Sequence, residues 1–409
     1  MRVLQIGVGT VGEAIARMAA HRDWCEQMVL ADYDVERATA LQTELGDPDR
    51  FPVERVDAGD SAAVAELASR HGSTLLMNAV DPRFVLSLFD GALAAGIDYM
   101  DMANSLSRPH PSKPFSRPGI KLGDEQLARN AEWAAAGRLA LIGMGMDPGL
   151  SDVFARHAAD QLFDEVDEVH IRDGGDLHIP GYAFAPVFSI WTTIEECLNP
   201  PVVWADGDWH TTEPFSAVED FPFPEGIGPV ECVNVEHEEV LLVPRWIPGV
   251  KRVTFKYALG ADFIEKLKFL HDIGLDRTQP VTVRGVDVSP RDVVAAVVPD
   301  PLTMGDKMVG RAIVGTWVIG RKDGKPREVF LYQMADARQT MLTTRSQVVG
   351  WQTGFNPVLA MELLANGTWS GSGVLGPEAF DAAPYLALMD QHGIHHAMVE
   401  MEPGAHRPT

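Results

Sequence analysis

The chain has 409 residues, which is enough for two or three domains that each have their own core. Its hydrophobic content of 46% and its charged content of 22% are ordinary for a soluble globular enzyme. The net charge of −24 argues against binding to nucleic acids or to anionic membranes, because contacts to phosphates need basic patches.

The first predicted elements form a nucleotide-binding half-site. An apolar run over Arg2–Ile6 is followed by Gly7-Val-Gly9-Thr-Val-Gly12, by an alanine-rich helical stretch and by a second apolar run, Met28–Ala31. In a βαβ unit of this kind, Gly7 permits the turn, Gly9 lets a pyrophosphate approach the backbone, and Gly12 lets the helix pack closely. The unpaired N–H groups of the helix start favour phosphates. The predicted phosphate-binding residues are Gly7, Gly9, Thr10, Val11 and Gly12.

An acidic residue follows the second strand at the spacing expected for a dinucleotide site. Asp32 lies 20 residues after Gly12, about where a carboxylate accepts hydrogen bonds from the adenosine ribose. A carboxylate there repels a 2′-phosphate, so the sequence favours NAD over NADP. Arg37 is close enough in the sequence to keep NADP as an alternative.

Strands and helices continue to alternate up to about residue 150. Further strands are predicted at 53–57, 74–80, 98–102 and 139–143, and helices near 35–46, 61–70, 82–95 and 123–136. Six short strands with helices between them are typical of a Rossmann-type, doubly wound parallel sheet. We therefore expect residues 1–149 to form an NAD(P)-binding domain. The proline-rich stretch 104–118 breaks the alternation and is a candidate lid loop.

The pattern changes after residue 150, where apolar runs follow one another. Strands are predicted at 168–172, 202–204, 240–243, 252–259 and 313–319, with a hairpin turn over Lys322–Lys325 that leads into 327–333. Helices are predicted over 262–273 and from Ser289, a good N-cap before Pro290. Residues 150–344 are thus expected to form a mixed α/β domain with a largely antiparallel sheet.

The remaining segment, 345–409, is expected to pack back on the first domain. Residues 345–365 have a helical pattern, which we expect to be interrupted near Gly354–Pro357. This return of the chain would close a cleft between the two domains, where substrates usually bind.

Polar residues at the carboxyl ends of the predicted parallel strands are candidates for the site, because ligands bind there in doubly wound sheets. Asp57 could approach the adenine or simply cap a helix. Asp101 is expected close to the nicotinamide, and Asp147 is the best candidate for an acid or base, although Asp-Pro-Gly is also a strong turn signal. Cofactor contact is expected after the strand at 74–80, from Asn78, Ala79 and Val80.

The second domain offers further candidates. Arg172 is predicted to clamp a substrate carboxylate, with a solvated strand-end arginine as the alternative. Lys256 and Tyr257 are candidate catalytic residues, but neighbours on a strand alternate, so one of them is expected to face away from the cleft. His237, which precedes two glutamates, lacks the paired spacing of a metal site, and no metal is expected.

Cysteine usage and hydropathy bear on location. Cys25, Cys197 and Cys232 lie far apart, so we expect buried free thiols in a reducing cytoplasm. The sequence shows no signal peptide pattern and no run of about 18 uncharged apolar residues, so neither export nor a membrane span is expected.

Taken together, the motifs resemble the saccharopine dehydrogenase family, in the branch that also holds lysine 6-dehydrogenases and carboxynorspermidine dehydrogenases. The resemblance spans nearly the whole chain. It is carried by Gly7–Gly12 with Asp32, Asn78–Pro82, Ala95–Asp101, Gly145–Gly149 with Ser151 and Asp152, Arg172–Gly175, Phe255–Tyr257 and Gly373–Glu378. Met144 stands where related reductases have a cysteine, and Lys256 where polyamine-pathway relatives have an arginine. Both departures fall near the substrate-binding region that the resemblance implies.

The resemblance implies an NAD-dependent oxidoreductase that acts on a C–N bond of a small amino acid, by hydride transfer with imine hydrolysis or formation. It also implies a homodimer, with the dimer contact in the middle domain. The leading hypothesis is a saccharopine dehydrogenase; the alternatives are a lysine 6-dehydrogenase, a carboxynorspermidine dehydrogenase and a non-enzymatic NAD-sensing module. Saccharopine carries three carboxylates, so cationic side chains in the cleft would distinguish it from simpler amines.

Overall fold

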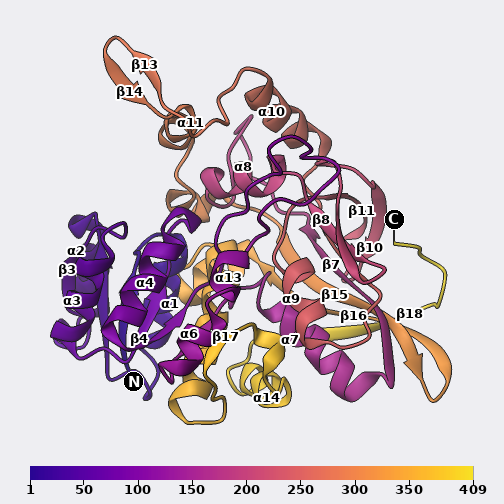
Figure 1. The fold of residues 1–409 in the computed structure, drawn as a ribbon, viewed down its shortest axis with the longest axis horizontal. Helices are drawn as coiled ribbons and strands as arrows, with labels where there is room; N and C mark the ends of the chain where they lie inside the picture. The colour runs from indigo at the N-terminus through magenta and orange to yellow at the C-terminus, as the bar shows by residue number, and fades with distance from the viewer. Residues whose placement is uncertain (409) are drawn as a thin grey trace.

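Within residues 1–408, which the computed structural model describes, seven strands form a parallel sheet at the left of Figure 1. The strands are β1 (Arg2–Ile6), β2 (Gln27–Asp32), β3 (Val53–Arg55), β4 (Leu75–Asn78), β5 (Asp98–Met100), β6 (Leu139–Leu141) and β17 (Gly373–Leu375). Their order is β17-β6-β5-β4-β1-β2-β3. The order reverses between β1 and β4, which creates the switch point at which such sheets bind ligands. The predicted Rossmann-type sheet is confirmed.

Helices cover both faces of this sheet. They are α1 (Thr10–Ala19), α2 (Val35–Leu45), α3 (Ser61–His71), α4 (Val85–Ala95), α5 (Asp124–Leu127) and α6 (Asn130–Ala135). Along β1, Val3 packs into the core on one face and Leu4 into the core on the other. Burial on both faces explains why the strands are apolar runs without polar alternation. The helix predicted at 123–136 is two short helices.

The described part of the chain also contains a nine-stranded sheet, with the main order β10-β11-β12-β7-β15-β16-β18; β8 pairs with β12, and β9 pairs with β8. Its strands are β7 (Glu165–Gly175), β8 (Val202–Ala205), β9 (Asp208–Thr211), β10 (Glu219–Phe223), β11 (Gly228–Asn234), β12 (Arg252–Tyr257), β15 (Arg311–Lys322), β16 (Lys325–Asp336) and β18 (Ala397–Met401). Among these strands only β12 and β7 pair in parallel. The largely antiparallel sheet and the hairpin turn at Lys322–Lys325 are confirmed.

Helices and connections surround the second sheet. The helices are α7 (Leu150–His157), α8 (Ile190–Leu198), α9 (Glu239–Trp246), α10 (Ala261–Asp272), α11 (Pro290–Val297), α12 (Ala337–Thr344), α13 (Val348–Ala365) and α14 (Ala383–Gln391). Ser289 caps α11 as predicted, because its hydroxyl accepts from the Asp292 N–H. A hairpin of β13 (Val281–Val283) and β14 (Val286–Val288) projects beside α11 (Figure 1).

Two predicted features are wrong. Val240–Val243 belong to α9 and not to a strand; they are fully buried, and a short apolar run does not distinguish a buried helix from a strand. The helix α13 continues through Gly354–Pro357 without an interruption. Gly354 lies against α1, where an added Cβ would come within 3.1 Å of the Ala14 side chain. Pro357 has no N–H for the carbonyl of Thr353, one turn earlier.

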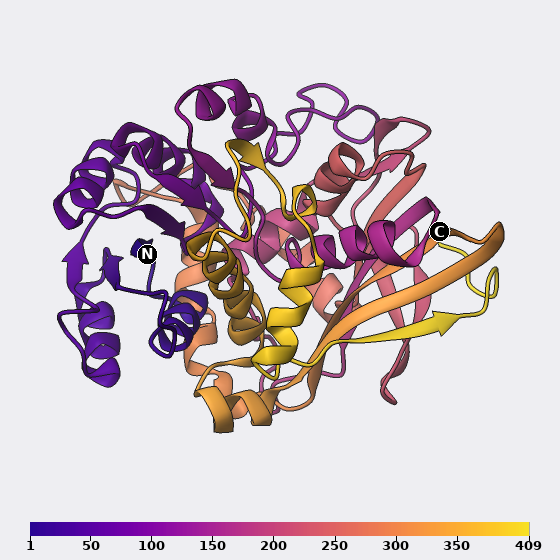
Figure 2. The ribbon, with the colours of Figure 1, turned by 90° about the horizontal axis from the view of Figure 1, so that it is seen from below.

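The C-terminal elements connect the two sheets. Figure 2 shows α13 and α14, in orange to yellow, between the parallel sheet and the long strands of the second sheet. The strand β17 lies at the edge of the first sheet beside β6, whereas β18 pairs with β16 of the second. All three cysteines are free and buried, as expected. No helix of the described residues is long and apolar enough to cross a membrane.

Candidate active site

A cavity of about 550 Å³ lies at the carboxyl ends of β1 and β4, where the strand order reverses. One wall consists of the start of α1 and the loop after β4, and the opposite wall includes residues of α8 and α11. The predicted cofactor-binding residues that line it are Gly9, Thr10, Val11, Asn78, Ala79 and Val80. The fold therefore brings two separate sequence motifs to one place.

The glycine-rich turn fits the diphosphate of a dinucleotide. At Gly7, where φ is +104°, an added Cβ would lie 2.4 Å from the carbonyl oxygen of Ala79, and at Gly12 it would lie 2.2 Å from that of Gly7. At Gly9 the nearest atom to such a Cβ is a guanidinium nitrogen of Arg37, 3.9 Å away. The helix α1 starts beside Gly9 without a side-chain cap, so its first N–H groups are available to an anion. Gly7 and Gly12 are therefore needed for the shape of the turn, and Gly9 leaves space beside the backbone for a diphosphate.

The two acidic residues predicted to contact the adenosine half of the coenzyme accept hydrogen bonds from backbone N–H groups. Asp32 accepts from the N–H groups of Val8, at 2.7 Å, and Asp34, at 2.8 Å, and so ties the glycine-rich turn to the end of β2. Asp57 accepts from the N–H of Gly59 at 2.8 Å. Neither Asp32 nor Asp57 lines the cavity in the described structure, whereas Arg37 does.

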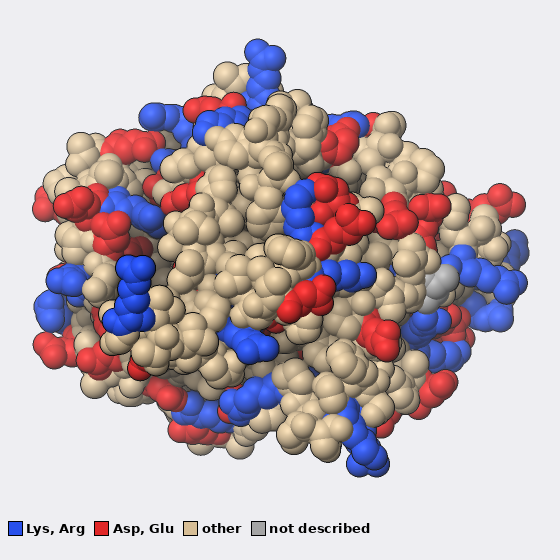
Figure 3. Space-filling model, turned by 90° about the horizontal axis from the view of Figure 1, so that it is seen from above, with Lys and Arg blue, Asp and Glu red and all other residues tan. Residues whose placement is uncertain are grey.

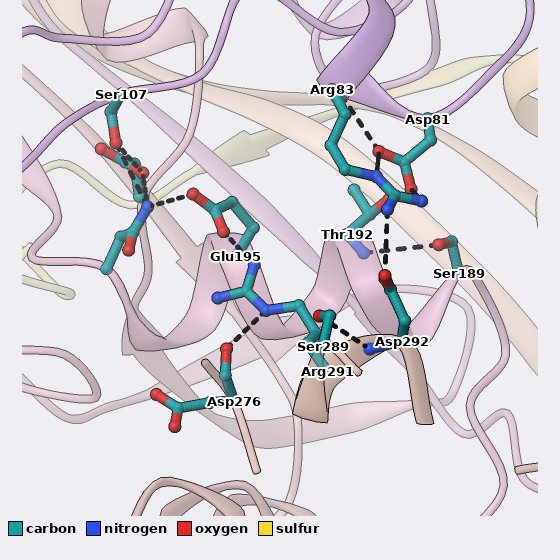
Figure 4. A network of polar contacts seen from close by, with 12 residues as sticks. Asp81, Arg83, Ser107, Ser189, Thr192, Glu195, Asp276, Ser289, Arg291 and Asp292 are labelled. Atoms are coloured by element: carbon teal, nitrogen blue, oxygen red, sulfur yellow. Dashed lines mark hydrogen bonds and ion pairs between the residues drawn. The ribbon is translucent and has the colours of Figure 1, made fainter. Parts of the chain in front are cut away.

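The α11 wall is held in place by ion pairs (Figure 4). Arg291 pairs with Glu195 on α8. Asp292 accepts from Nη1 of Arg83, which follows β4 in the short helix Pro82–Phe84, at 3.1 Å. The residues of α11 that line the cavity therefore stand between the parallel sheet and α8.

Asp101 lies directly after β5 and lines the cavity, although only 1% of it is exposed. Its two oxygens accept from the N–H of Gly143, at 2.7 Å, and from Nε2 of Gln126, at 2.8 Å. Burial raises the pKa of Asp101 to about 7 despite these donors. A carboxyl group with such a pKa can hold or release a proton at neutral pH.

A second cavity of about 300 Å³ adjoins the first and shares Asp147, Asp173 and Tyr257 with it. Together with Glu196 and Glu238 of the larger cavity, these two aspartates form a group of four carboxyl groups that we call the acidic junction. Among the described residues that line the two cavities, Arg37 is the one arginine and none is a lysine. By contrast, acidic and basic side chains are interspersed on the outer face shown in Figure 3.

Burial and mutual repulsion make the acidic junction hard to ionise. Burial raises the pKa of Asp173 to about 7 and that of Glu196 to about 8. For Asp147, burial and the nearby Asp173 raise the pKa well above its ordinary value. Carboxyl groups confined in this way are stabilised as anions when a cation binds between them. The acidic junction therefore suits a positively charged ligand.

His237 lies beside the acidic junction and was not singled out for catalysis by the sequence. Its Nδ1 is 2.6 Å from Oε2 of Glu239, and its ring stacks on Phe255 with the centroids 3.6 Å apart. The only sequence signal was a histidine followed by two glutamates, which does not indicate where the ring points.

Three of the predicted catalytic and substrate-binding residues do not reach the cavities. Arg172 and Lys256 are fully buried on the other face of β7 and β12, where both contact Glu219, at 2.5 and 2.7 Å. They are direct neighbours in the register of these strands, so they share a face, and Tyr257 points to the opposite side, towards the cavities. Met144 is buried in the core and does not line either cavity.

Comparisons with known proteins cover nearly the whole chain. A model of the saccharopine dehydrogenase NADP binding domain matches residues 3–141, and a model of the saccharopine dehydrogenase C-terminal domain matches residues 145–394. Carboxynorspermidine synthase of Vibrio cholerae is 29% identical over 99% of this chain and 98% of its own length. Carboxyaminopropylagmatine dehydrogenase of Synechocystis sp. is 28% identical over 96% of both chains.

Among solved structures, apo saccharopine dehydrogenase (L-Glu forming) from Saccharomyces cerevisiae aligns with a TM-score of 0.69 and 16% identity. The alignment covers 98% of this chain and all of the yeast chain. At this identity the match establishes a shared fold.

Proposed function

The chain belongs to the saccharopine dehydrogenase family, and from this premise we propose that its substrate is a carboxylated polyamine whose secondary amine it forms or breaks. Family membership confirms the resemblance drawn from the motifs. It also confirms the prediction of an oxidoreductase that acts on a C–N bond, as opposed to an NAD-sensing module.

The composition of the acidic junction carries the proposal. Four carboxyl groups line this part of the cavities, and the described lining residues there include neither lysine nor arginine. Saccharopine would bring three carboxylates into this field, with neither lysine nor arginine to receive them and with His237 already paired with Glu239. A polyamine brings several ammonium groups, which the junction can stabilise. The names of the two sequence relatives denote polyamines that bear a carboxyl group.

We assign the residues as follows. The start of α1 holds the coenzyme diphosphate, Asn78–Val80 contact the coenzyme, and the nicotinamide supplies or accepts a hydride at the substrate carbon. Asp101 exchanges a proton beside this position. Asp147 and Tyr257 face the amine, where Asp147 accepts a proton from the ammonium that must react as a free amine.

For the coenzyme we propose NAD, because the carboxylate of Asp32 ends β2 and disfavours a 2′-phosphate nearby. NADP is a second candidate, favoured by Arg37, which lines the cavity with its guanidinium 3.6 Å from Asp300. An Arg37→Ala variant distinguishes them. If NADP is the coenzyme, its KM should rise about tenfold or more while that of NAD stays constant.

An oxidation assay tests the substrate proposal. The purified protein is supplied with NAD or NADP and with carboxynorspermidine, carboxyaminopropylagmatine, saccharopine or lysine, and the reduced coenzyme is followed by its absorbance. We expect kcat/KM for one of the two carboxylated polyamines to exceed that for saccharopine by at least about tenfold, or roughly 1.4 kcal/mol. A preference for saccharopine or lysine would reject the proposal.

Two predictions about organisation are kept as proposals. We propose that the domains are residues 1–149, 150–344 and 345–409, and that the chain forms a homodimer. Light scattering of the purified protein measures the oligomeric state directly, and a monomer at assay concentrations would reject the homodimer.

A further inference from the structure

We propose that His237 is the acid–base residue of the C–N step and that Glu239 is its positioning residue. The proposal deepens the proposed function and rests on it, because it requires an amine and an aldehyde to react in the cavity that His237 lines. Neither residue was among the predicted catalytic residues.

The imidazole of His237 is fixed from two sides. Nδ1 lies 2.6 Å from Oε2 of Glu239, and the ring is stacked on Phe255 with an angle of 6° between the planes. Glu239 is itself fully buried and held in place, because its Oε1 accepts from the hydroxyl of Ser151 at 2.8 Å. A carboxylate partner on Nδ1 sets the tautomer and the direction of the other ring nitrogen.

The other ring nitrogen, Nε2, is the one available to a substrate. No hydrogen bond to it occurs among the described residues, and His237 lines the same cavity as Asp101 and Tyr257. Each of the rival groups has another task. In the proposed assignment Asp101, held by two donors, exchanges a proton beside the nicotinamide, and Asp147 takes the proton of the ammonium before the amine reacts. The other carboxyl groups of the acidic junction bind the cation. Burial raises the pKa of Tyr257 well above its ordinary value, which makes the phenol a poor acid.

The charged groups around His237 favour its protonated form. Burial opposes the charge, but Glu239, Glu238 and Asp147 together raise the pKa of His237 well above its ordinary value. Asp173 and Glu196 face it from β7 and α8 and act in the same direction. His237 therefore enters the reaction as an imidazolium with a proton on Nε2.

In the direction of amine formation, the free amine first adds to the aldehyde carbon. Nε2 of His237 then donates its proton to the new hydroxyl group. The C–O bond breaks, water leaves, and the nitrogen lone pair forms the C=N bond of an iminium ion. The hydride of the reduced nicotinamide supplies the two electrons that reduce this carbon. Solvent then reprotonates His237, and in the reverse direction Nε2 removes a proton from the attacking water.

The test compares His237→Gln, Glu239→Gln and His210→Gln, a control at an exposed histidine on β9. Each variant is assayed with whichever amine of the oxidation panel the unaltered protein uses best. We expect kcat of H237Q to fall by about 10²- to 10⁴-fold, with coenzyme affinity and thermal stability retained. In H237Q the C–N step should limit the rate and hydride transfer should not. The isotope effect on kcat from deuterium at the carbon that gives up the hydride should therefore fall towards one. H210Q should match the unaltered protein.

The Glu239 variant has a readout other than turnover. An NMR titration should find the pKa of His237 lower in E239Q than in the unaltered protein, and the acidic limb of the kcat profile should move with it. If H237Q does not fold, this titration of E239Q still tests the proposed roles of His237 and Glu239. An H237Q variant with kcat within about threefold of the unaltered protein, or an unshifted His237 pKa in E239Q, would overturn the proposal. A preference for saccharopine would reject only the proposal of a polyamine substrate. If the protein turned over no amine, both that proposal and the role of His237 would be rejected.

Discussion

Arg83 of the parallel-sheet half and Asp292 of α11 are joined across the side of the larger cavity, with Nη1 of Arg83 donating to Oδ1 of Asp292 at 3.1 Å (Figure 4). Both side chains are partly exposed. The chain after α11 continues into residues that line the cavity near the proposed coenzyme site. The pair therefore links the α11 wall of the proposed coenzyme site to the loop that follows β4.

The first prediction concerns this pair. Asp292→Asn should accelerate coenzyme release by roughly two- to fivefold at low salt, because an exposed ion pair contributes up to about 1 kcal/mol. The difference should disappear near 1 M salt, where such pairs are screened. Stopped-flow release measures it, with Asp287→Asn in the projecting hairpin as the control. Equal release rates at low salt would show that the α11 wall does not retain the coenzyme.

The second prediction separates the two tasks of the glycine-rich turn. Gly9→Ala should fold normally, because its added Cβ has no neighbour nearer than a guanidinium nitrogen of Arg37 at 3.9 Å, but should weaken coenzyme binding by about tenfold or more. Gly12→Ala should instead lower the melting temperature, because its Cβ would lie 2.2 Å from a carbonyl oxygen of the same turn. Calorimetry and thermal unfolding of both variants check this. Tight coenzyme binding by G9A would place the diphosphate elsewhere.

The third prediction follows from the carboxyl group of Glu196, whose pKa burial raises to about 8. A folded-state pKa above the unfolded value means that ionisation costs stability as the pH rises. Glu196→Gln should therefore be more stable than the unaltered protein at about pH 9 and not at about pH 4, where the group is protonated in both states.

The same substitution should have the opposite effect on substrate binding. The affinity of the unaltered protein for a polyamine should rise between about pH 6 and pH 8, as Asp173 and Glu196 become anions, and E196Q should lose part of this rise. Substrate KM over this range measures it, with the exposed Glu265→Gln as the control. A polyamine KM that is identical in E196Q would remove Glu196 from the binding site.

The fourth prediction assigns a structural role to Arg172 and Lys256. Although burial opposes its ionisation, both cations lower the pKa of Glu219 to about 2. The stability that this carboxylate contributes is present above its ordinary pKa and is lost as the pH falls towards 2. Glu219→Gln should lower the free energy of unfolding by about 3 kcal/mol and leave the polyamine KM unchanged. Urea unfolding measures the loss; a large rise in KM would return Arg172 to the substrate site.

The local sequence was sufficient to predict the glycine-rich turn and the βαβ unit at the proposed coenzyme site. The turn, the helix start and the second strand lie within the first 32 residues. The constraint on Gly12 comes from the carbonyl of Gly7 in the same turn, whereas the close neighbour of Gly7 is Ala79, which follows β4. The cap at Ser289 and the hairpin turn after β15 were predictable for the same reason. Where burial on all sides removed the periodic signal, as in Val240–Val243, the prediction was wrong.

The substrate end was decided by tertiary packing. Of the 58 acidic residues in the chain, the sequence singled out Asp147, but nothing in it separates Asp173 and Glu196 from carboxyl groups on the surface or indicates that these three lie together. They come from a loop, a strand and a helix, and only the packing of these elements brings them together beyond the reach of lysine or arginine. Tertiary packing likewise decided which face of β7 and β12 is covered. Arg172 lies buried on one face, whereas Tyr257 lies on the other face and lines the cavities. The interaction energy of charged groups depends on the distance between them and on their burial. Neither quantity is determined by the neighbours of a residue in the sequence.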